Sequence, residues 1–112
     1  MRLTTRLMST AKKELKEWLV VIYDKPNVDR LKFRGQHLDG LPAVAGKTMT
    51  SGGAILNKDG KLIGSSLHLR ANNESEIISF LKDDIYAKEG IWDFDNYLIH
   101  ELKVAYREGK EI

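Results

Sequence analysis

The most constraining feature of this sequence is a run of apolar residues near its start, "WLVVIY" at positions 18–23. β-Branched and aromatic residues dominate the run, and Pro26 closes it shortly afterwards. A continuous apolar run of this kind is typical of a strand that is buried on both faces. The segment therefore predicts the central strand of a sheet, against which the rest of the chain must pack.

Two later segments have the spacing of amphipathic helices. The first covers residues 27–45, where leucines recur at helical intervals and Asn27 is the expected N-cap. Gly40 and Pro42 predict a break near its end, because glycine weakens a helix and proline cannot continue one. The second helix follows in "NNESEIISFLKDD", where we expect Asn73 to cap the first turn.

The remaining segments predict three further strands. Residues 47–56 and 61–70 flank "NKDG", a strong hairpin signal because Asp-Gly tolerates the positive φ angles of a tight reversal. Residues 95–106 alternate again and predict the last strand. In the third strand, alternation predicts that the more buried face carries Ile63, Ser65, Leu67 and Leu69.

The order strand, helix, strand, strand, helix, strand predicts an α+β fold. Two split βαβ units of this kind form the ferredoxin-like βαββαβ arrangement, a four-stranded antiparallel sheet with both helices on one face. With 112 residues, the chain fits one such domain. The other face of the sheet lacks cover, and we expect a homodimer to bury it.

Charge is distributed unevenly along the chain. Residues 1–16 contain five basic residues against one acidic residue, a net charge of +4, whereas the remainder carries −2. This basic, hydroxyl-rich leader has the composition of a mitochondrial presequence, although a disordered basic tail or a start at Met8 fits equally well. We expect a domain over residues 17–106 and a polar tail over residues 107–112. Because cysteine is absent, we expect an intracellular protein, either cytoplasmic or mitochondrial.

Several classes of function lack their sequence signals. The third strand, "KLIGSSLHLR", has no aromatic residue with which a sheet could stack RNA bases, and no basic face continues the leader, so no nucleic-acid partner is expected. No apolar run approaches the roughly 20 residues that span a bilayer, so no membrane partner is expected. Three scattered histidines without cysteine predict no metal site, and the absence of phosphate-binding glycine motifs predicts no cofactor.

Four short segments together resemble a known family. "FRGQHLDGL", "SGGAI", "IGSSL" and "DDIYAKEGIWD" resemble, in order and approximate spacing, the YCII-related (YciI-like) family. That family typically has an Arg-x-x-His-Leu helix, a glycine pair in the second strand, a Gly-Ser in the third, and Asp-Pro-Tyr after the second helix. The resemblance covers residues 17–106 and implies a dimeric α+β barrel with a histidine and an aspartate at its active centre.

Carried over by motif, the catalytic pair implied by this resemblance is His37 and Asp84. The residues implied to bind substrate or line the cleft are Arg34, Gly52, Gly53, Gly64, Ser65 and Tyr86. Two departures concern the aspartate. Ile85 replaces the usual proline, which leaves the turn less rigid, and the neighbouring Asp83 makes the choice of acid ambiguous by one residue.

The chemistry of such a pair is proton transfer. A histidine exchanges protons near neutral pH, and a carboxylate bonded to one ring nitrogen fixes its tautomer and stabilises its charged form. His37 would be the acid/base and Asp84 its orienting partner in an isomerase- or lyase-like enzyme acting on a small organic acid or phenol. The alternatives are a buried structural histidine, a solvent-exposed acidic pair at residues 83–84, and a non-catalytic dimeric module that binds a small ligand.

Overall fold

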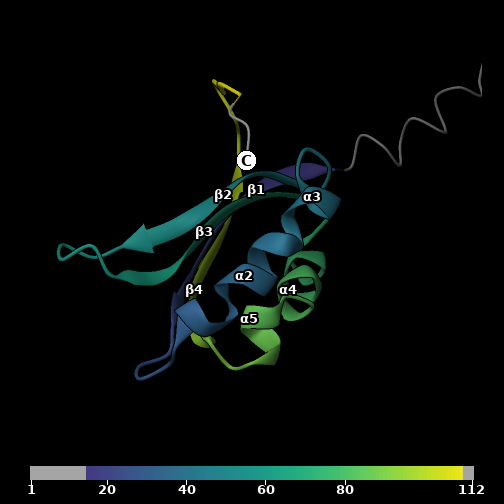
Figure 1. The fold of residues 1–112 in the computed structure, drawn as a ribbon. Coiled ribbons are helices and arrows are strands. Elements are labelled where there is room, and N and C mark those ends of the chain that lie inside the picture. Colours follow the sequence, from purple (N-terminus) through teal and green to yellow (C-terminus); the bar gives the residue numbers. More distant parts are fainter. Residues whose placement is uncertain (1–14, 110–112) are drawn as a thin grey trace, which may run out of the picture.

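The computed structural model describes residues 15–109 as a single sheet with helices packed on one face (Figure 1). The strands are antiparallel in the order β2-β3-β1-β4, so the predicted ferredoxin-like fold is confirmed. In chain order, the elements of this part of the chain are β1 Lys16–Asp24, α2 Arg30–Asp39, α3 Leu41–Val44, β2 Met49–Leu56, β3 Leu62–Ala71, α4 Glu74–Lys82, α5 Ile85–Lys88 and β4 Trp92–Leu102.

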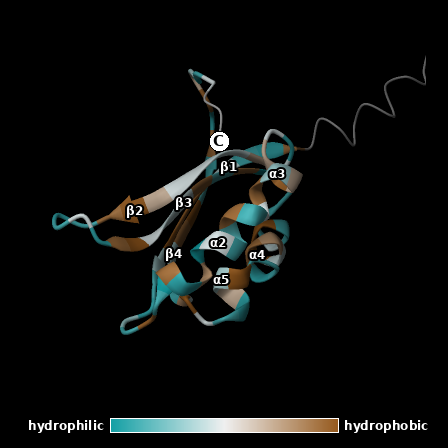
Figure 2. Cartoon of the chain, viewed as in Figure 1, coloured by the Kyte–Doolittle hydropathy of each residue, from teal (hydrophilic) through white to brown (hydrophobic). Residues whose placement is uncertain are grey.

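The core lies between the sheet and the helices, and β1 runs through its centre as the apolar run predicts. Alternate residues of β1 face the helices, and Val20 and Ile22 are fully buried there. Leu67 and Leu69 of β3 lie opposite Val20 and Trp18 of β1 and are buried on the same face. Figure 2 shows apolar residues along the strands, whereas the β2–β3 turn is polar. Alternation in β3 therefore places its residues on the two faces as predicted.

The first helix begins later than predicted. Asp29 caps α2, because its side chain accepts a hydrogen bond from the backbone N–H of Lys32 at 3.3 Å. Asn27 instead has a φ angle of 62° and lies in the turn after β1, so the prediction that it caps the helix is wrong. Asparagine tolerates the left-handed conformation, which explains its place there. The break expected near Gly40 is confirmed, since α2 ends at Asp39 and α3 begins at Leu41.

The last strand was predicted over residues 95–106 but occupies Trp92–Leu102. Residues 92–95 alternate apolar and acidic side chains, but the pairing with β1 shifts register between Trp92 and Tyr97, so Phe94 and Tyr97 both pack against the core. The Asp93 side chain accepts a hydrogen bond from the backbone N–H of Asp95 in this region. Further along, Leu98 and His100 lie opposite Val21 and Leu19. These residues face away from the helices, on the open face of the sheet.

The hairpin signal at residues 57–60 is confirmed. The N–H of Gly60 donates to the carbonyl of Asn57 at 3.0 Å, and Gly60 has a φ of 81°. The Asn57 side chain supports the turn by accepting from the backbone N–H groups of Asp59 and Lys61. Figure 1 shows that the β2–β3 hairpin projects beyond the helices.

The basic leader was predicted over residues 1–16, and residues 1–14 of it lie outside the described residues, as do residues 110–112 of the predicted tail. Lys16, the last residue of the predicted leader, is the first residue of β1. Across residues 15–109, none of the helices has the length and apolar character needed to cross a membrane.

Candidate active site

His37 and Asp84 meet at the ends of two helices that are distant in sequence. His37 lies in the last turn of α2, and Asp84 is the residue that precedes α5. The His37 Nδ1 and Asp84 Oδ1 atoms are 2.9 Å apart, and the two side chains are 12% and 21% exposed. The two residues thus form a hydrogen-bonded pair that is shielded from bulk water but still reachable.

The backbone of α5 fixes the position of the carboxylate. Asp84 is the N-cap of α5, and its Oδ1 atom accepts a hydrogen bond from the N–H of Tyr86 at 2.9 Å. Asp83, in contrast, ends α4 and is exposed. Of the two neighbouring acids, it is therefore Asp84 that lies against the histidine.

Two buried aromatic rings surround the imidazole. The His37 ring stacks on Tyr86 with 4.1 Å between centroids and 16° between planes. Trp92 meets the His37 ring edge-on at 6.1 Å and the Tyr86 ring at 5.6 Å. Burial raises the pKa of Tyr86 above its ordinary value of 10.0, although the charge of Arg30 opposes this effect.

A polar network lies in the core beside these rings. The Arg30 Nε atom donates to Asp24 Oδ2 at 2.9 Å, and its Nη2 atom donates to Ser65 Oγ. The Trp92 indole N–H donates to the same Ser65 oxygen at 3.1 Å. Burial raises the pKa of Asp24, while the Arg30 charge and hydrogen bond lower it. Among the described residues, the Asp24 Oδ1 atom and the Tyr86 hydroxyl have no hydrogen-bond partner.

A groove of about 510 Å³ opens beside the His37–Asp84 pair. The pair forms part of its wall, and Gln36 and Lys88 add an amide and a cation. The apolar part of the lining comes from Leu41, Val44, Met49, Phe80 and Ile85. Such a mixture of apolar surface and a few polar groups is typical of small-molecule sites. Within residues 15–109, His, Asp and Glu side chains form no group of three that could hold a metal ion.

The predicted binding residues from α2 and β2 are only partly gathered at this groove. Arg34 is exposed on α2, and its charge, like that of Arg30, opposes the rise that burial causes in the pKa of Tyr86. Gly52 lies near Met49, which lines the groove; a Cβ atom added to Gly52 would be 2.9 Å from Met49 Sδ. Gly53 is exposed, with no atom within 4 Å of such a Cβ.

The predicted residues from β3 and α5 have different surroundings. Ser65 is 2% exposed and Tyr86 is fully buried. Tyr86 contacts both His37 and Asp84, whereas Ser65 contacts Arg30 and Trp92. Gly64 pairs with Tyr23 and faces the opposite side of the sheet, so the expectation that it lines the cleft is wrong. A Cβ atom there would be 2.7 Å from the Ile22 carbonyl oxygen, which shows that close strand approach requires the glycine.

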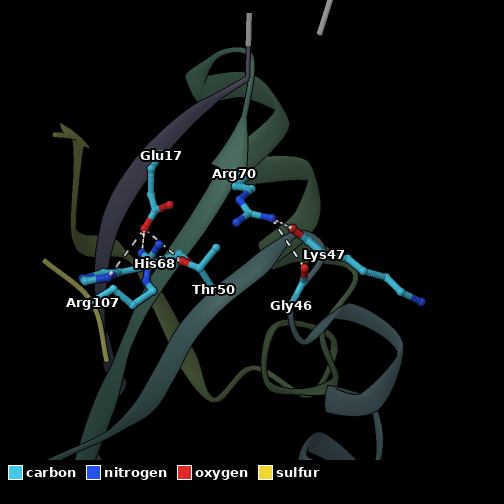
Figure 3. A network of polar contacts seen from close by, with 7 residues as sticks. All are labelled: Glu17, Gly46, Lys47, Thr50, His68, Arg70 and Arg107. Carbon is cyan, nitrogen blue, oxygen red and sulfur yellow. Dashed lines mark hydrogen bonds and ion pairs between the residues drawn. The ribbon is translucent and has the colours of Figure 1, made fainter. Parts of the chain in front are cut away.

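A second polar cluster lies on the open face of the sheet (Figure 3). The Glu17 carboxylate accepts hydrogen bonds from Thr50 Oγ1 at 2.9 Å and from Arg107, and His68 Nδ1 is 3.9 Å away. Arg107 also donates to Thr50 at 3.1 Å. This cluster joins the segment after β4 to three strands and is separated from His37 by the sheet.

Sequence reasoning missed Arg30, Asp24 and Lys88. Arg30 precedes His37 by seven residues, so the helical repeat brings both to the same face of α2. This spacing could have indicated that Arg30 lies near the site. No sequence pattern around Lys88 indicated a place in the groove, because that place depends on how α5 packs against α2.

Comparison with curated proteins gives matches over most of the chain. Fusaric acid biosynthesis protein 2 of Gibberella fujikuroi is 31% identical over 99 residues, which cover 80% of this chain and 95% of the relative. The protein of the same name from Gibberella moniliformis matches to the same extent. The chain belongs to the fusaric acid biosynthesis protein 2 family.

A third curated relative is much longer than this chain. Aspartate kinase FUB3 of Fusarium oxysporum f. sp. lycopersici is 32% identical over 101 residues, but the chain spans only 19% of that longer relative. No protein-family model matches the sequence. Among solved structures, 5-chloro-2-hydroxyhydroquinone dehydrochlorinase from Burkholderia phenoliruptrix, in complex with 2,5-dihydroxybenzoquinone, superposes with a TM-score of 0.65 at 23% identity, covering 78% of this chain and 93% of that one. This likeness shows that this member of the fusaric acid biosynthesis protein 2 family shares the fold of that enzyme.

Proposed function

We propose that this protein is a small-molecule enzyme, isomerase- or lyase-like, in which His37 and Asp84 transfer protons on a small organic acid or phenol. The YCII-related family, with its domain over residues 17–106, is part of this proposal. The observation that carries it is the 2.9 Å contact between His37 Nδ1 and Asp84 Oδ1 beside an open groove. The names of the relatives and of the structural neighbour, a biosynthesis protein and a dehydrochlorinase, support the same class.

The proposal gives each ring nitrogen of His37 its own role. Nδ1 faces Asp84, so Nε2 is the atom left to take a proton from a ligand. The carboxylate then stabilises the imidazolium, as an orienting acid does for a general base. Return of the proton to another atom of the ligand would complete an isomerisation. Departure of a leaving group with its bonding electrons would complete an elimination.

The groove favours a ligand with an apolar body and an acidic group. Its apolar lining would bury a ring or alkyl part, and Lys88 offers a cation to a carboxylate or phenolate. Arg34, one turn before His37 on α2, is the second cation of this region. Both are proposed as binding residues rather than as participants in the chemistry.

A second copy of the chain is proposed to cover the open face of the sheet. Leu98 is 52% exposed there and pairs directly with Val21, while Leu19 lies at the next position of β1 on that face. The part of this face around Leu98, Val21 and Leu19 is apolar, and it is the part that the second copy is proposed to cover. The non-catalytic alternative, a dimeric module that binds a small ligand, would use the same face and the same groove.

A thermal-shift screen tests ligand binding at the groove. The probes are fusaric acid, 2,5-dihydroxybenzoquinone and simple phenols, applied to wild type, His37→Ala and the control Lys32→Ala, at an exposed position of the same helix. Stabilisation of wild type and Lys32→Ala that His37→Ala loses would support the proposal. Equal stabilisation of all three proteins would contradict a role for His37.

A further inference from the structure

Arg30 is a buried cation whose place in the core needs an explanation. It is 6% exposed at the first position of α2, and Asp24 holds it at 2.9 Å with a side chain that is 8% exposed. Buried ion pairs add little net stability, because desolvation offsets the attraction between the charges. The fold alone therefore does not account for an arginine here.

Arg30 lies on the same aromatic ring as the proposed catalytic histidine. The Arg30 Cζ atom is 4.5 Å from the Tyr86 ring centroid, and the His37 ring is 4.1 Å from the same centroid. A guanidinium at this distance is attracted to an aromatic face. The backbone N–H of Tyr86 also holds Asp84 Oδ1. Tyr86 therefore contacts Arg30, His37 and Asp84 at once.

Ser65 and Trp92 contact Arg30, His37 and Tyr86 from the side of the sheet. Ser65 Oγ accepts from both Arg30 and the Trp92 indole, and the Trp92 ring makes T-shaped contacts with the rings of His37 and Tyr86. The planar guanidinium makes contacts in fixed directions, to Asp24 and to Ser65, which an ammonium cannot reproduce together. The orientation of the Tyr86 ring thus depends on the shape of the arginine as well as its charge.

We infer that Arg30 is a positioning residue, which acts through Tyr86 to fix the plane of the His37 ring and the place of Asp84. The catalytic consequence of this role rests on the function proposed above. The positioning itself does not, because it can be measured on the free protein.

Nuclear magnetic resonance of His37 provides the test. Imidazole protons that lie over a tyrosine ring resonate upfield. Tyr86→Leu therefore gives the chemical shift of the His37 ring protons without stacking, and Tyr86→Phe gives their chemical shift with stacking. The main variant is Arg30→Lys, which keeps the charge next to Asp24 and loses the planar group. The control is Lys32→Met, an exposed residue of the same helix.

The expected result is that His37 signals in Arg30→Lys move from the wild-type position toward that of Tyr86→Leu, while Lys32→Met leaves them unchanged. The double variant Asp24→Asn/Arg30→Met, which removes both charges, should move them at least as far. Folded Arg30→Lys with wild-type His37 signals would overturn the inference, whether or not the double variant folds. An inactive enzyme whose His37 signals respond as expected would refute the proposed function and leave the positioning intact.

Discussion

The Asp84 Oδ1 atom lies 2.9 Å from His37 Nδ1 and, at the same time, 2.9 Å from the backbone N–H of Tyr86. One carboxylate oxygen therefore joins the cap of α5 to the imidazole. Any substitution at Asp84 must affect both the stability of the fold and the state of His37.

Replacement of the two neighbouring acids should separate their roles. Asp84→Ala removes an N-cap and is expected to lower the free energy of unfolding by about 1 kcal/mol, and up to about 2 kcal/mol with the loss of the His37 contact. Asp83→Ala, at an exposed position, should change it by less than about 0.5 kcal/mol. Urea denaturation of both variants measures the difference. Equal losses of unfolding free energy in the two variants would mean that the contacts of Asp84 with His37 and with the Tyr86 N–H do not stabilise the fold.

Tyr86→Phe is expected to change the response of the protein to alkaline pH. The raised pKa of Tyr86 means that, above its ordinary value of 10.0, the unfolded chain loses this proton before the folded chain does. The folded state then holds more protons, so stability falls as pH rises from 10 toward the folded pKa. Melting curves between pH 8 and 11 should show a shallower decline in the variant.

At neutral pH the same substitution should do no harm. It removes a buried hydroxyl that has no partner among the described residues, and such a group costs about 1–3 kcal/mol. Tyr86→Phe should therefore be as stable as wild type or more so. A clear loss of stability at pH 7 would show that the hydroxyl is bound to something the protein needs.

Two glycines predicted for one site should respond differently to alanine. Gly64→Ala places a Cβ atom 2.7 Å from the Ile22 carbonyl oxygen and should cost about 1–3 kcal/mol. Gly53→Ala meets nothing within 4 Å and should stay within about 0.5 kcal/mol of wild type. Chemical denaturation distinguishes these outcomes, and similar costs at both positions would contradict the close approach of β1 to β3 at Gly64.

Lysine in place of an apolar residue on the open face tests the proposed dimer. Leu98→Lys should convert the protein to a monomer in size-exclusion chromatography with light scattering, because a charge would be buried against the second copy. Leu31→Lys is the matched control, since Leu31 is 68% exposed on α2, away from the open face. A wild-type monomer, or a dimer that survives Leu98→Lys, would argue against this interface.

The parts of the fold that could be predicted from sequence are those with local causes. The apolar run of β1, the Asn73 cap of α4, whose side chain accepts from the Glu76 N–H, and the turn at Gly60 each depend on a few neighbouring residues, and all three predictions are confirmed. The start of β4 was predicted wrongly because a register shift between Trp92 and Tyr97 changes which alternate residues face the core, so the pattern of the later residues does not extend back to Trp92.

The surroundings of His37 were less accessible to prediction, because they depend on packing between distant elements. Arg30 would ordinarily be assigned to the surface on the basis of its charge, and only its contacts with Asp24 and Ser65 explain its burial. Likewise, nothing local to Tyr86 shows that its ring lies against His37, since this requires α5 to pack on α2.

The central claim, that His37 moves protons on a bound ligand, is tested most directly by hydrogen exchange at carbon. In deuterated buffer, wild-type protein should accelerate the loss of carbon-bound hydrogen from 2,5-dihydroxybenzoquinone, observed by proton magnetic resonance. His37→Gln should reduce that rate by about 10²- to 10⁴-fold, the usual contribution of a general acid or base, while Lys32→Gln, at an exposed position of the same helix, should keep it. A His37→Gln protein that is folded and exchanges at the wild-type rate would contradict the claim, as would wild-type protein that gives no acceleration at all.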